Sequence, residues 1–314
     1  MNIPNYTDVE QAHKIVQKYA HRTPVLSSVS INSIVGAELF FKCENLQKVG
    51  AFKFRGACNA VFSLSEEDAQ KGVATHSSGN HAAALALAAH MRGIAAHIVM
   101  PENSPGIKKK AVAGYGAKIT FCKPTLQARE RTLAKVIEET GATEIHPYSN
   151  FNVIAGQGTA AKELIEDKGD FDVIMAPVGG GGLLSGTAIS TKHLLPACKV
   201  IAAEPVGADD AYRSFHSGKF VPSENPKTIA DGLLTSLGER NFAIILDKVD
   251  DIVTVSEESI VEAMRMIWER MKIIIEPSSA VPLAAILEKK VDVQGKKVGI
   301  ILSGGNLDLG KLPF

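Results

Sequence analysis

The sequence lacks an excess of charge of either sign. Its 314 residues include 34 lysines and arginines and 34 aspartates and glutamates, so the formal net charge at pH 7 is zero. The basic residues form no long block of the kind that binds nucleic acid or anionic lipid. The composition therefore argues against nucleic acid and membrane as partners. We expect a small molecule, or a second copy of the chain, instead.

Cysteines and long apolar runs are also scarce. The four cysteines lie far apart and form no CxxC pair, which argues against a zinc site and a disulfide framework. The longest Ala/Leu-rich run, residues 82–89, is too short to span a bilayer. The first residues, MNIPNYTDVEQAHK, contain neither the basic nor the apolar segment of a signal peptide. We therefore expect a soluble cytoplasmic protein.

The sequence does contain a regular alternation of short apolar runs and amphipathic segments, which is typical of strands connected by helices in a largely parallel sheet. We predict strands at residues 39–43, 73–76, 95–100, 118–122, 173–177, 200–203, 252–255 and 298–302. We predict helices at residues 9–19, 54–64, 80–92, 105–114, 126–140, 155–167, 183–195, 257–272 and 277–288. We expect a small domain, 72–149, inserted in a large domain, 1–71 and 150–314, with a ligand in the cleft between them.

The stretch VGAFKFRGAC, residues 49–58, places a lysine between two phenylalanines. On a helix that begins here, Lys53 lies in line with four apolar residues, Ala57, Ala60, Val61 and Leu64. A buried amine without a partner tends to lose its proton, and proteins prepare lysines for Schiff-base chemistry in this way. The alternatives are a lysine that extends to solvent or one that pairs with a carboxylate.

Two turns have the composition of anion sites. Ser77, Ser78, Gly79 and Asn80 follow a predicted strand and open an Ala-rich helix, where free N–H groups and the positive helix end suit a carboxylate or phosphate. An ordinary helix cap is the alternative there. Gly179 to Gly182 link another strand to a helix, and four consecutive glycines let the backbone approach a phosphate closely.

The glycine run does not match the standard nucleotide motifs. GxGxxG fails because no register supplies the third glycine, and the P-loop fails because Thr187 follows Gly186 where a lysine belongs. Glu204 lies about twenty residues further on at a predicted strand end, where a dinucleotide-binding fold keeps its ribose-binding acid. An NAD-dependent oxidoreductase therefore remains an alternative.

Two further turns follow predicted strands. Glu204, Asp209 and Asp210 lie within seven residues and suit Mg²⁺ or Ca²⁺, although the spacing alone favours a solvated acidic turn with helix-capping aspartates. Near the C-terminus, residues 303–306 read Ser-Gly-Gly-Asn. Their small side chains allow a flat ligand to approach, and Ser303 offers it a hydroxyl group rather than a charge. An ordinary turn is the alternative.

In order and spacing, the inward lysine, the Ser-Ser-Gly-Asn-His turn, the tetraglycine loop and the final Ser-Gly-Gly-Asn turn resemble those of fold-type II pyridoxal-phosphate enzymes. Within that class the chain resembles the serine racemase and serine/threonine dehydratase family over nearly its whole length. The resemblance implies a two-domain, tryptophan synthase β-like α/β fold with largely parallel sheets covered by helices. It also implies a homodimer.

The resemblance implies roles for individual residues. Lys53 would carry pyridoxal phosphate, Phe52 would flank its ring, and Ser303 would meet its pyridine nitrogen. Asn80 would hydrogen-bond its phenolic oxygen. The phosphate would lie on Gly179, Gly180, Gly181 and Gly182. The substrate carboxylate would lie on Ser77, Ser78, Gly79, Asn80 and His81. A divalent cation, Mg²⁺ or Ca²⁺, would bind Glu204, Asp210 and the carbonyl oxygen of Ala208.

The same resemblance implies the reaction. Lys53 removes the α-proton, after which either the β-hydroxyl leaves, giving a keto acid and ammonia, or the proton returns from the opposite face. Ser78 is placed for that return, since racemases of the family carry serine there and many dehydratases carry alanine. The following HAAAL lacks the glycine and glutamine of animal serine racemases. Activation by ATP is therefore doubtful, although Lys48, Lys109 and Tyr115 are compatible with part of such a site.

Several functions stay open at this stage. Tyr148, Ser149 and Asn150 offer hydroxyls and an amide that would favour a second carboxylate, so 3-hydroxyaspartate and aspartate are alternative substrates. A β-replacement synthase of the same fold is a further alternative. A catalytically silent metabolite-binding protein would have lost the lysine, and Lys53 is present.

Overall fold

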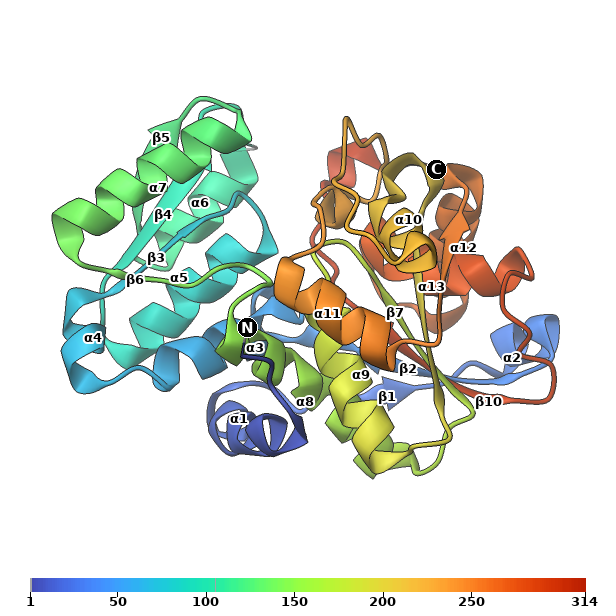
Figure 1. Cartoon of the computed structure of the whole chain (residues 1–314). Coiled ribbons are helices and arrows are strands. Elements are labelled where there is room, and N and C mark those ends of the chain that lie inside the picture. Colours follow the sequence, from blue (N-terminus) through green and yellow to red (C-terminus); the bar gives the residue numbers. More distant parts are fainter. Residues whose placement is uncertain (1, 105) are drawn as a thin grey trace.

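The computed structural model describes residues 2–104 and 106–314, and within them the strands form two sheets (Figure 1). The first sheet has the order β1-β2-β10-β7-β8-β9, with strands β1 (Val25–Leu26), β2 (Glu38–Cys43), β10 (Lys297–Leu302), β7 (Val173–Pro177), β8 (Lys199–Pro205) and β9 (Asp251–Val255). The second has the order β5-β4-β3-β6, with strands β5 (Lys118–Cys122), β4 (Ala96–Pro101), β3 (Val73–His76) and β6 (Thr143–Glu144). Every pair is parallel except β1 with β2. The predicted α/β fold with largely parallel sheets is confirmed.

Helices alternate with these strands along the chain. The α-helices are α1 (Tyr6–Tyr19), α2 (Val29–Val35), α3 (Lys53–Phe62), α4 (Glu66–Lys71), α5 (Asn80–Arg92), α6 (Gly106–Gly114), α7 (Leu126–Thr140), α8 (Phe151–Lys168), α9 (Gly182–Leu194), α10 (Asp210–Ser217), α11 (Glu239–Lys248), α12 (Glu257–Met271) and α13 (Pro277–Leu287). Short 3-10 turns are η1 (Glu44–Leu46), η2 (Lys48–Gly50), η3 (Val206–Ala208), η4 (Asp231–Leu233) and η5 (Leu309–Lys311).

Helices cover both faces of the larger sheet. Side chains alternate between the faces of a strand, so Met175 of β7 packs in the core beneath α12 and α13, while Ala176 packs in the core beneath α9. The smaller sheet is covered in the same way: Ile98 of β4 packs toward α5, and Val99 packs toward α7. Strands β7 and β4 are therefore covered by helices on both faces.

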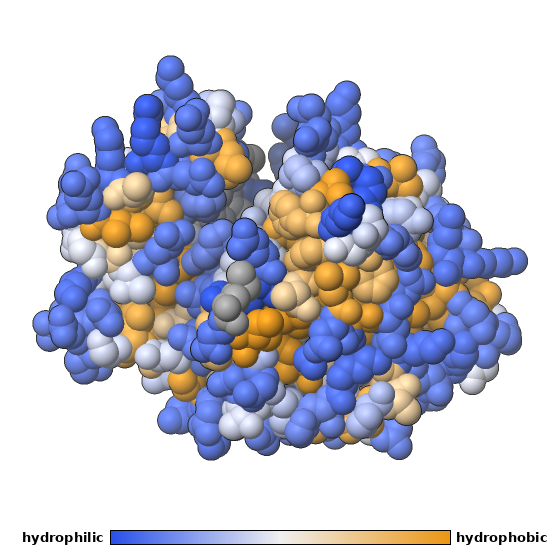
Figure 2. Space-filling model, viewed as in Figure 1, coloured by the Kyte–Doolittle hydropathy of each residue, from blue (hydrophilic) through white to orange (hydrophobic). Residues whose placement is uncertain are grey.

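Helix α3 lies between the two sheets. Its buried side chains join the core of the smaller sheet through α5, while its opposite side packs on α8 of the larger sheet. Gly56 of α3 and Gly156 of α8 lie at this crossing, where a side chain on either glycine would overlap the other helix. Figure 2 shows the surface hollowed between the parts built on the two sheets. Lys53, the first residue of α3, therefore sits where the two parts meet.

Most predicted elements are present within a few residues of their expected bounds. The helix expected at 105–114 is described from Gly106, and Pro105 lies outside the described residues. The strands β1 and β6 and the helices α2, α4, α10 and α11 were not predicted. The predicted domain boundaries near Lys71 and Asn150 fall just outside the segment that forms β3 to β6, and this division stays a prediction.

Candidate active site

The start of α3 pairs with the chain that follows β10. Ala51 forms an antiparallel bridge with Gly304. The Phe52 N–H donates to the Ser303 carbonyl oxygen at 2.9 Å, and the Gly305 N–H donates to the Gly50 carbonyl oxygen at the same distance. These bonds place the lysine segment directly beside the terminal Ser-Gly-Gly-Asn turn, although the two are far apart in the sequence.

The Lys53 amine has no carboxylate partner within bonding distance among the described residues. Its Nζ donates to the Pro147 carbonyl oxygen at 3.1 Å and lies 5.0 Å from the centre of the Phe52 ring. The residue is half-buried, and desolvation lowers the pKa of Lys53 to about 8, while the negative charge of Glu276 acts in the opposite direction. An amine with this pKa is partly unprotonated near neutral pH and can act as a base or a nucleophile.

The tetraglycine loop, residues 179–182, leads from β7 into α9. Gly181 is the N-cap with φ 87°, a conformation that favours glycine, and no side chain of the described residues caps the helix. A Cβ on Gly180 would overlap the Tyr148 ring. The Asn241 amide donates to the carbonyl oxygens of Gly180, at 2.6 Å, and Tyr148, at 3.0 Å. The Asn241 bonds therefore hold the loop in place. The N–H groups at the uncapped start of α9 remain free of side-chain partners among the described residues, and such groups suit a phosphate.

The Ser-Ser-Gly-Asn turn follows β3 and opens α5. Its N-cap is Gly79, and no side chain of the described residues caps the helix, so the alternative of an ordinary serine or asparagine cap is wrong. Within the turn, the Gly79 N–H donates to Ser77 Oγ at 3.4 Å. The first-turn N–H groups lack helical partners and suit a carboxylate.

His81 lies in the first turn of α5 and stays neutral. Its side chain is buried, and its Nε2 lies 2.9 Å from the Ile145 carbonyl oxygen, so Nε2 must carry the proton. Burial, with the nearby Lys53 charge second, lowers the pKa of His81 to about 3. His81 therefore offers the turn no positive charge, and the N–H groups of the backbone remain the donors for a carboxylate.

Glu276 is a site residue that the sequence analysis missed. This buried carboxylate accepts hydrogen bonds from the Asn80 amide, at 3.2 Å to each oxygen, and from the Asn306 N–H at 3.1 Å. Burial raises the pKa of Glu276 to about 7. The only signal in the sequence is an acid that directly follows an apolar run and precedes a proline, in IIIEP.

Ser303 lies at the end of β10 and is buried. Its Oγ is 3.1 Å from the Oγ of Ser279, which accepts a hydrogen bond from the Gly304 N–H at 2.7 Å. Ser279 was not predicted as a site residue. The pair places two hydroxyl groups, and no charge of their own, where the lysine segment meets β10.

Glu204 and Asp210 are two buried carboxylates at the end of β8 and the start of α10. Burial, followed by the charge of Asp210, raises the pKa of Glu204 to about 9, and burial raises the pKa of Asp210 to about 6. Ala208, whose carbonyl was the predicted third ligand, is buried in η3 between them. The described residues contain no group of three or more His, Cys, Asp and Glu side chains placed for a metal. The predicted site offers two carboxylates and one backbone carbonyl.

The segment after β6 is more constrained than its polar sequence suggested. Asn150 is the N-cap of α8 and accepts from the Val153 N–H at 3.1 Å. The Tyr148 ring lies against Gly180 of the glycine loop. His146 Nδ1 accepts from the Ser149 N–H at 3.1 Å. Of the three side chains expected to contact the substrate, Asn150 is thus hydrogen-bonded within the protein as a helix cap.

Comparisons with known proteins show which family has this sequence and fold. The family model described as pyridoxal-phosphate dependent enzyme matches residues 16–304. A serine racemase of Dictyostelium discoideum is 55% identical over 97% of this chain and 95% of its own length. A beta-hydroxyaspartate dehydratase of Paracoccus denitrificans is 51% identical over the whole of both chains. The crystal structure of serine racemase from Dictyostelium discoideum superposes with a TM-score of 0.94 at 54% identity, covering 97% of this chain and 99% of that one.

The chain therefore belongs to the pyridoxal-phosphate dependent enzymes, and within them to the group that contains serine racemases and hydroxy-amino-acid ammonia-lyases. The predicted family, fold class, enzyme class and pyridoxal-phosphate cofactor are confirmed. The alternative of an NAD-dependent oxidoreductase is wrong: Glu204 instead accepts the N–H groups of Ala211 and Tyr212, each at 3.1 Å. Among the described residues, no helix combines the length and the apolarity needed to cross a membrane.

Proposed function

We propose that the chain is a racemase and dehydratase of serine and related β-hydroxy amino acids. The observation that carries this proposal is the Lys53 amine, which is desolvated, lacks a carboxylate partner and has a pKa of about 8. Such an amine can bind an aldehyde cofactor and can take a proton from a weakly acidic Cα–H bond.

The site's own features fit pyridoxal phosphate. The uncapped N-terminus of α9 and the glycines 179–182, where side chains would clash, fit the phosphate. The unpaired Lys53 amine fits the aldehyde carbon. The uncharged Ser303 hydroxyl fits a pyridine nitrogen that stays unprotonated, and the Asn80 amide fits the phenolic oxygen. When bound, the cofactor disperses the negative charge left at Cα.

The chain's own residues divide the remaining work. The N–H groups at the start of α5 bind the substrate carboxylate, together with the side chains of Ser77, Ser78 and Asn80. Lys53 takes the α-proton on one face. Ser78 returns a proton on the other face, which gives racemisation. If the β-hydroxyl leaves first, as water, an unsaturated amino acid remains. Its hydrolysis gives a keto acid and ammonia.

Incubation with single amino acids tests the proposal. Purified protein is given L-serine, D-serine and L-threonine, and both chirality and keto acid are followed. We expect keto acid from unactivated serine and interconversion of its enantiomers. Keto-acid release also separates this function from a β-replacement synthase, which needs an activated serine and a second nucleophile. Failure of both reactions on all three substrates would overturn the proposal.

Dehydration of 3-hydroxyaspartate, or racemisation of aspartate, is the second candidate function. It is supported by the dehydratase relative that is 51% identical over its full length and by the polar residues 148–150. The same assay with the 3-hydroxyaspartates and aspartate tests it. We expect turnover above that of alanine, which offers no leaving group and no second carboxylate; turnover equal to or below that of alanine would rule it out.

We further propose that Glu204, Asp210 and the Ala208 carbonyl oxygen hold Mg²⁺ or Ca²⁺. Two buried carboxylates with raised pKa values support this, because a hard cation would offset the cost of their charge. The division into domains 1–71 with 150–314 and 72–149, a cytoplasmic location and a homodimer are also proposals. Light scattering on the purified chain tests the last of these.

A further inference from the structure

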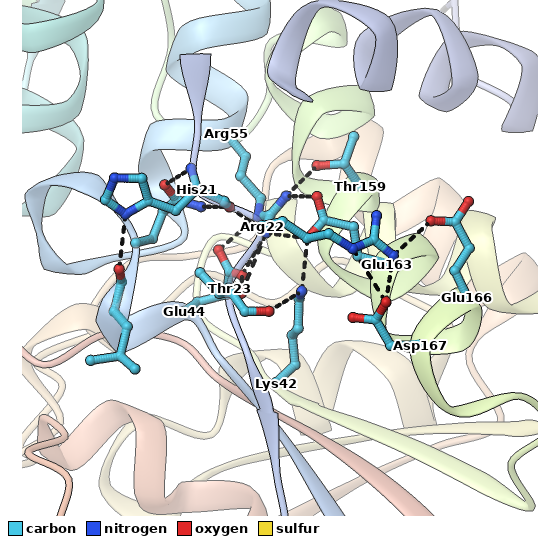
Figure 3. A network of polar contacts seen from close by, with 12 residues as sticks. His21, Arg22, Thr23, Lys42, Glu44, Arg55, Thr159, Glu163, Glu166 and Asp167 are labelled. Carbon is cyan, nitrogen blue, oxygen red and sulfur yellow. Dashed lines mark hydrogen bonds and ion pairs between the residues drawn. The ribbon is translucent and has the colours of Figure 1, made fainter. Parts of the chain in front are cut away.

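A cluster of four buried charges lies behind α3 and plays no part in the chemistry described above (Figure 3). We call it the Arg55 cluster, and it consists of Lys42, Glu44, Arg55 and Glu163. Their side chains are between 0% and 3% exposed. Two cations and two carboxylates make the cluster neutral overall. Its members come from three separate segments of the chain: β2 with the adjoining η1, α3, and α8.

Arg55 is held by both carboxylates at once. Its Nε and Nη2 donate to the two oxygens of Glu44 at 2.7 and 2.8 Å, and its Nη1 and Nη2 donate to the two oxygens of Glu163 at 2.8 and 2.7 Å. Nη1 also donates to Thr159 Oγ1 at 3.2 Å. Four of these five hydrogen bonds thus form two forks, one with each carboxylate, and the fifth goes to Thr159; the forks fix the plane and the direction of the guanidinium.

Lys42 stands outside these forks. Its Nζ donates to the Thr23 carbonyl oxygen at 2.8 Å and to Glu163 Oε2 at 2.7 Å, the oxygen that Arg55 Nη2 also meets, but it forms none of the four Arg55–carboxylate bonds. Lys42 therefore balances the charge of Glu163 without orienting α3. A change at Lys42 therefore alters the charge of the cluster while Arg55 keeps its bonds to both carboxylates, so the effects of charge and of geometry can be tested separately.

Stability alone is a weak reason for such a cluster. Removing four charges from water costs so much that apolar residues of similar size often serve a fold equally well, whereas deleting one partner costs about 3–5 kcal/mol. What apolar residues cannot supply is the directional fork. The arrangement is therefore better suited to fixing the orientation of α3 than to adding net stability.

Lys53 is the group whose position depends on that orientation. It begins α3 two residues before Arg55, so the two side chains leave opposite sides of the first turn. On one side Lys53 reaches Pro147 near the glycine loop, and on the other Arg55 is clamped against η1 and α8. A rotation or shift of this turn would move the amine directly.

We propose that Arg55, Glu44 and Glu163 are positioning residues, whose double fork fixes the first turn of α3 and thereby the place of the Lys53 amine relative to the cofactor and the α-carbon. The proposal rests on the proposed function for its kinetic readout. Its spectroscopic readout depends only on the cofactor that the family binds. A displacement of about 1 Å far from the chemistry can cost about 100-fold in rate.

The test compares variants of the holoenzyme that break the fork with one that removes charge alone. Arg55→Lys keeps the charge and loses the fork, and Glu163→Gln weakens one fork. Lys42→Met removes a charge but leaves both forks. Glu166→Gln is the matched control, because it lies one turn further on α8 in an exposed pair with Arg22 (Figure 3). Three quantities are measured well below the unfolding temperature: the visible circular dichroism per bound cofactor, kcat and KM for serine.

We expect Arg55→Lys and Glu163→Gln to lose visible circular dichroism and about 10- to 100-fold in kcat, with KM little changed. Lys42→Met should lower the urea midpoint but keep the dichroism and kcat. Glu166→Gln should change none of them. Should both fork variants fail to fold, Glu44→Gln decides, since it weakens the fork to η1 and leaves the pairing of Arg55 with Glu163 in place. It should reduce the dichroism more than Lys42→Met does.

Two results would overturn the proposal. In the first, Arg55→Lys, or Glu44→Gln in its place, keeps full dichroism and kcat. In the second, the losses follow the urea midpoints, so that Lys42→Met is as impaired as Glu163→Gln. If wild-type protein binds the cofactor but does not turn over serine, the proposed function fails. The dichroism of the variants still decides the role of the Arg55 cluster.

Discussion

The pKa of Lys53 is set by two opposing effects. Desolvation lowers it to about 8, and the negative charge of Glu276 holds it above the value that burial alone would give. Glu276→Gln removes that charge at nearly constant shape, so we expect the pKa of Lys53 to fall further. Because only the unprotonated amine couples with an aldehyde, the pH midpoint for reconstituting apo-protein with pyridoxal phosphate should move to lower pH. The visible absorbance of the bound cofactor, recorded against pH, measures this midpoint.

Glu262→Gln is the control for this experiment. It removes one carboxylate from an exposed position on α12, so the same net charge is lost without a change near Lys53. We expect the midpoint of Glu262→Gln to equal that of the wild type. An unchanged or higher midpoint in Glu276→Gln would show that Glu276 does not act on the lysine by its charge.

In the proposed function, Ser78 is the residue that returns the proton during racemisation. Ser78→Ala removes the hydroxyl proposed to return the proton, so racemisation should fall by about 100-fold or more, while elimination from one enantiomer continues. Chirality and keto acid, measured in the same reaction, separate the two. Ser77→Ala is the matched comparison, and we expect it to raise KM and leave the ratio of the two reactions intact. Unchanged racemisation in Ser78→Ala would remove that residue from the mechanism.

At the scale of elements, the crossing of α3 and α8 depends on two glycines. A Cβ at Gly156 would lie 2.7 Å from the Arg55 carbonyl oxygen and 2.7 Å from the Gly56 Cα, and both are backbone atoms that cannot move away alone. Gly156→Ala should therefore lower the free energy of unfolding by about 1–3 kcal/mol. Gly114→Ala, at the end of α6 with open space around it, should leave it within about 1 kcal/mol of wild type. Urea unfolding of both variants checks the contrast.

The elements that the sequence predicted well carry strong local signals. Helices α5 and α7 were predicted at their observed bounds, because α5 begins after a Ser-Ser-Gly turn and ends before Gly93, and α7 begins after Thr125 and ends before Gly141. The two-residue strands β1 and β6 are too short to show alternation, and exist because a neighbouring strand pairs with them. The short helix α2 and the amphipathic α10 depend on packing that sequence windows do not contain.

At the scale of the whole molecule, the site residues that were predicted and those that were missed differ in kind. Lys53, Ser78 and the glycine loop belong to short contiguous motifs, so they could be found one segment at a time. Glu276 and Asn241 act through partners that only the fold brings near: Asn80 lies almost two hundred residues before Glu276, and Gly180 lies sixty-one before Asn241. The Arg55 cluster has the same character. Its arginine was in the quoted motif, but nothing local indicated that its two carboxylates would come from η1 and α8.

The stability of the whole fold should depend jointly on pH and a divalent cation. The pKa values of Glu204 and Asp210 are raised from the ordinary carboxylate range to about 9 and about 6. Between the ordinary and the raised values the folded state holds more protons than the unfolded state, so the protein loses stability as pH rises through that range. A cation bound to these carboxylates replaces the protons and, at 100 times its Kd, adds about 2.7 kcal/mol. Mg²⁺ or Ca²⁺ should therefore raise the unfolding temperature more above the pKa of Asp210 than below it.

Asp210→Asn should abolish this gain in unfolding temperature. Asp209→Asn should keep it, because Asp209 is a neighbour that pairs instead with Arg213 at 2.8 Å. Equal gains in the two variants, or a gain that does not change with pH, would place the cation elsewhere.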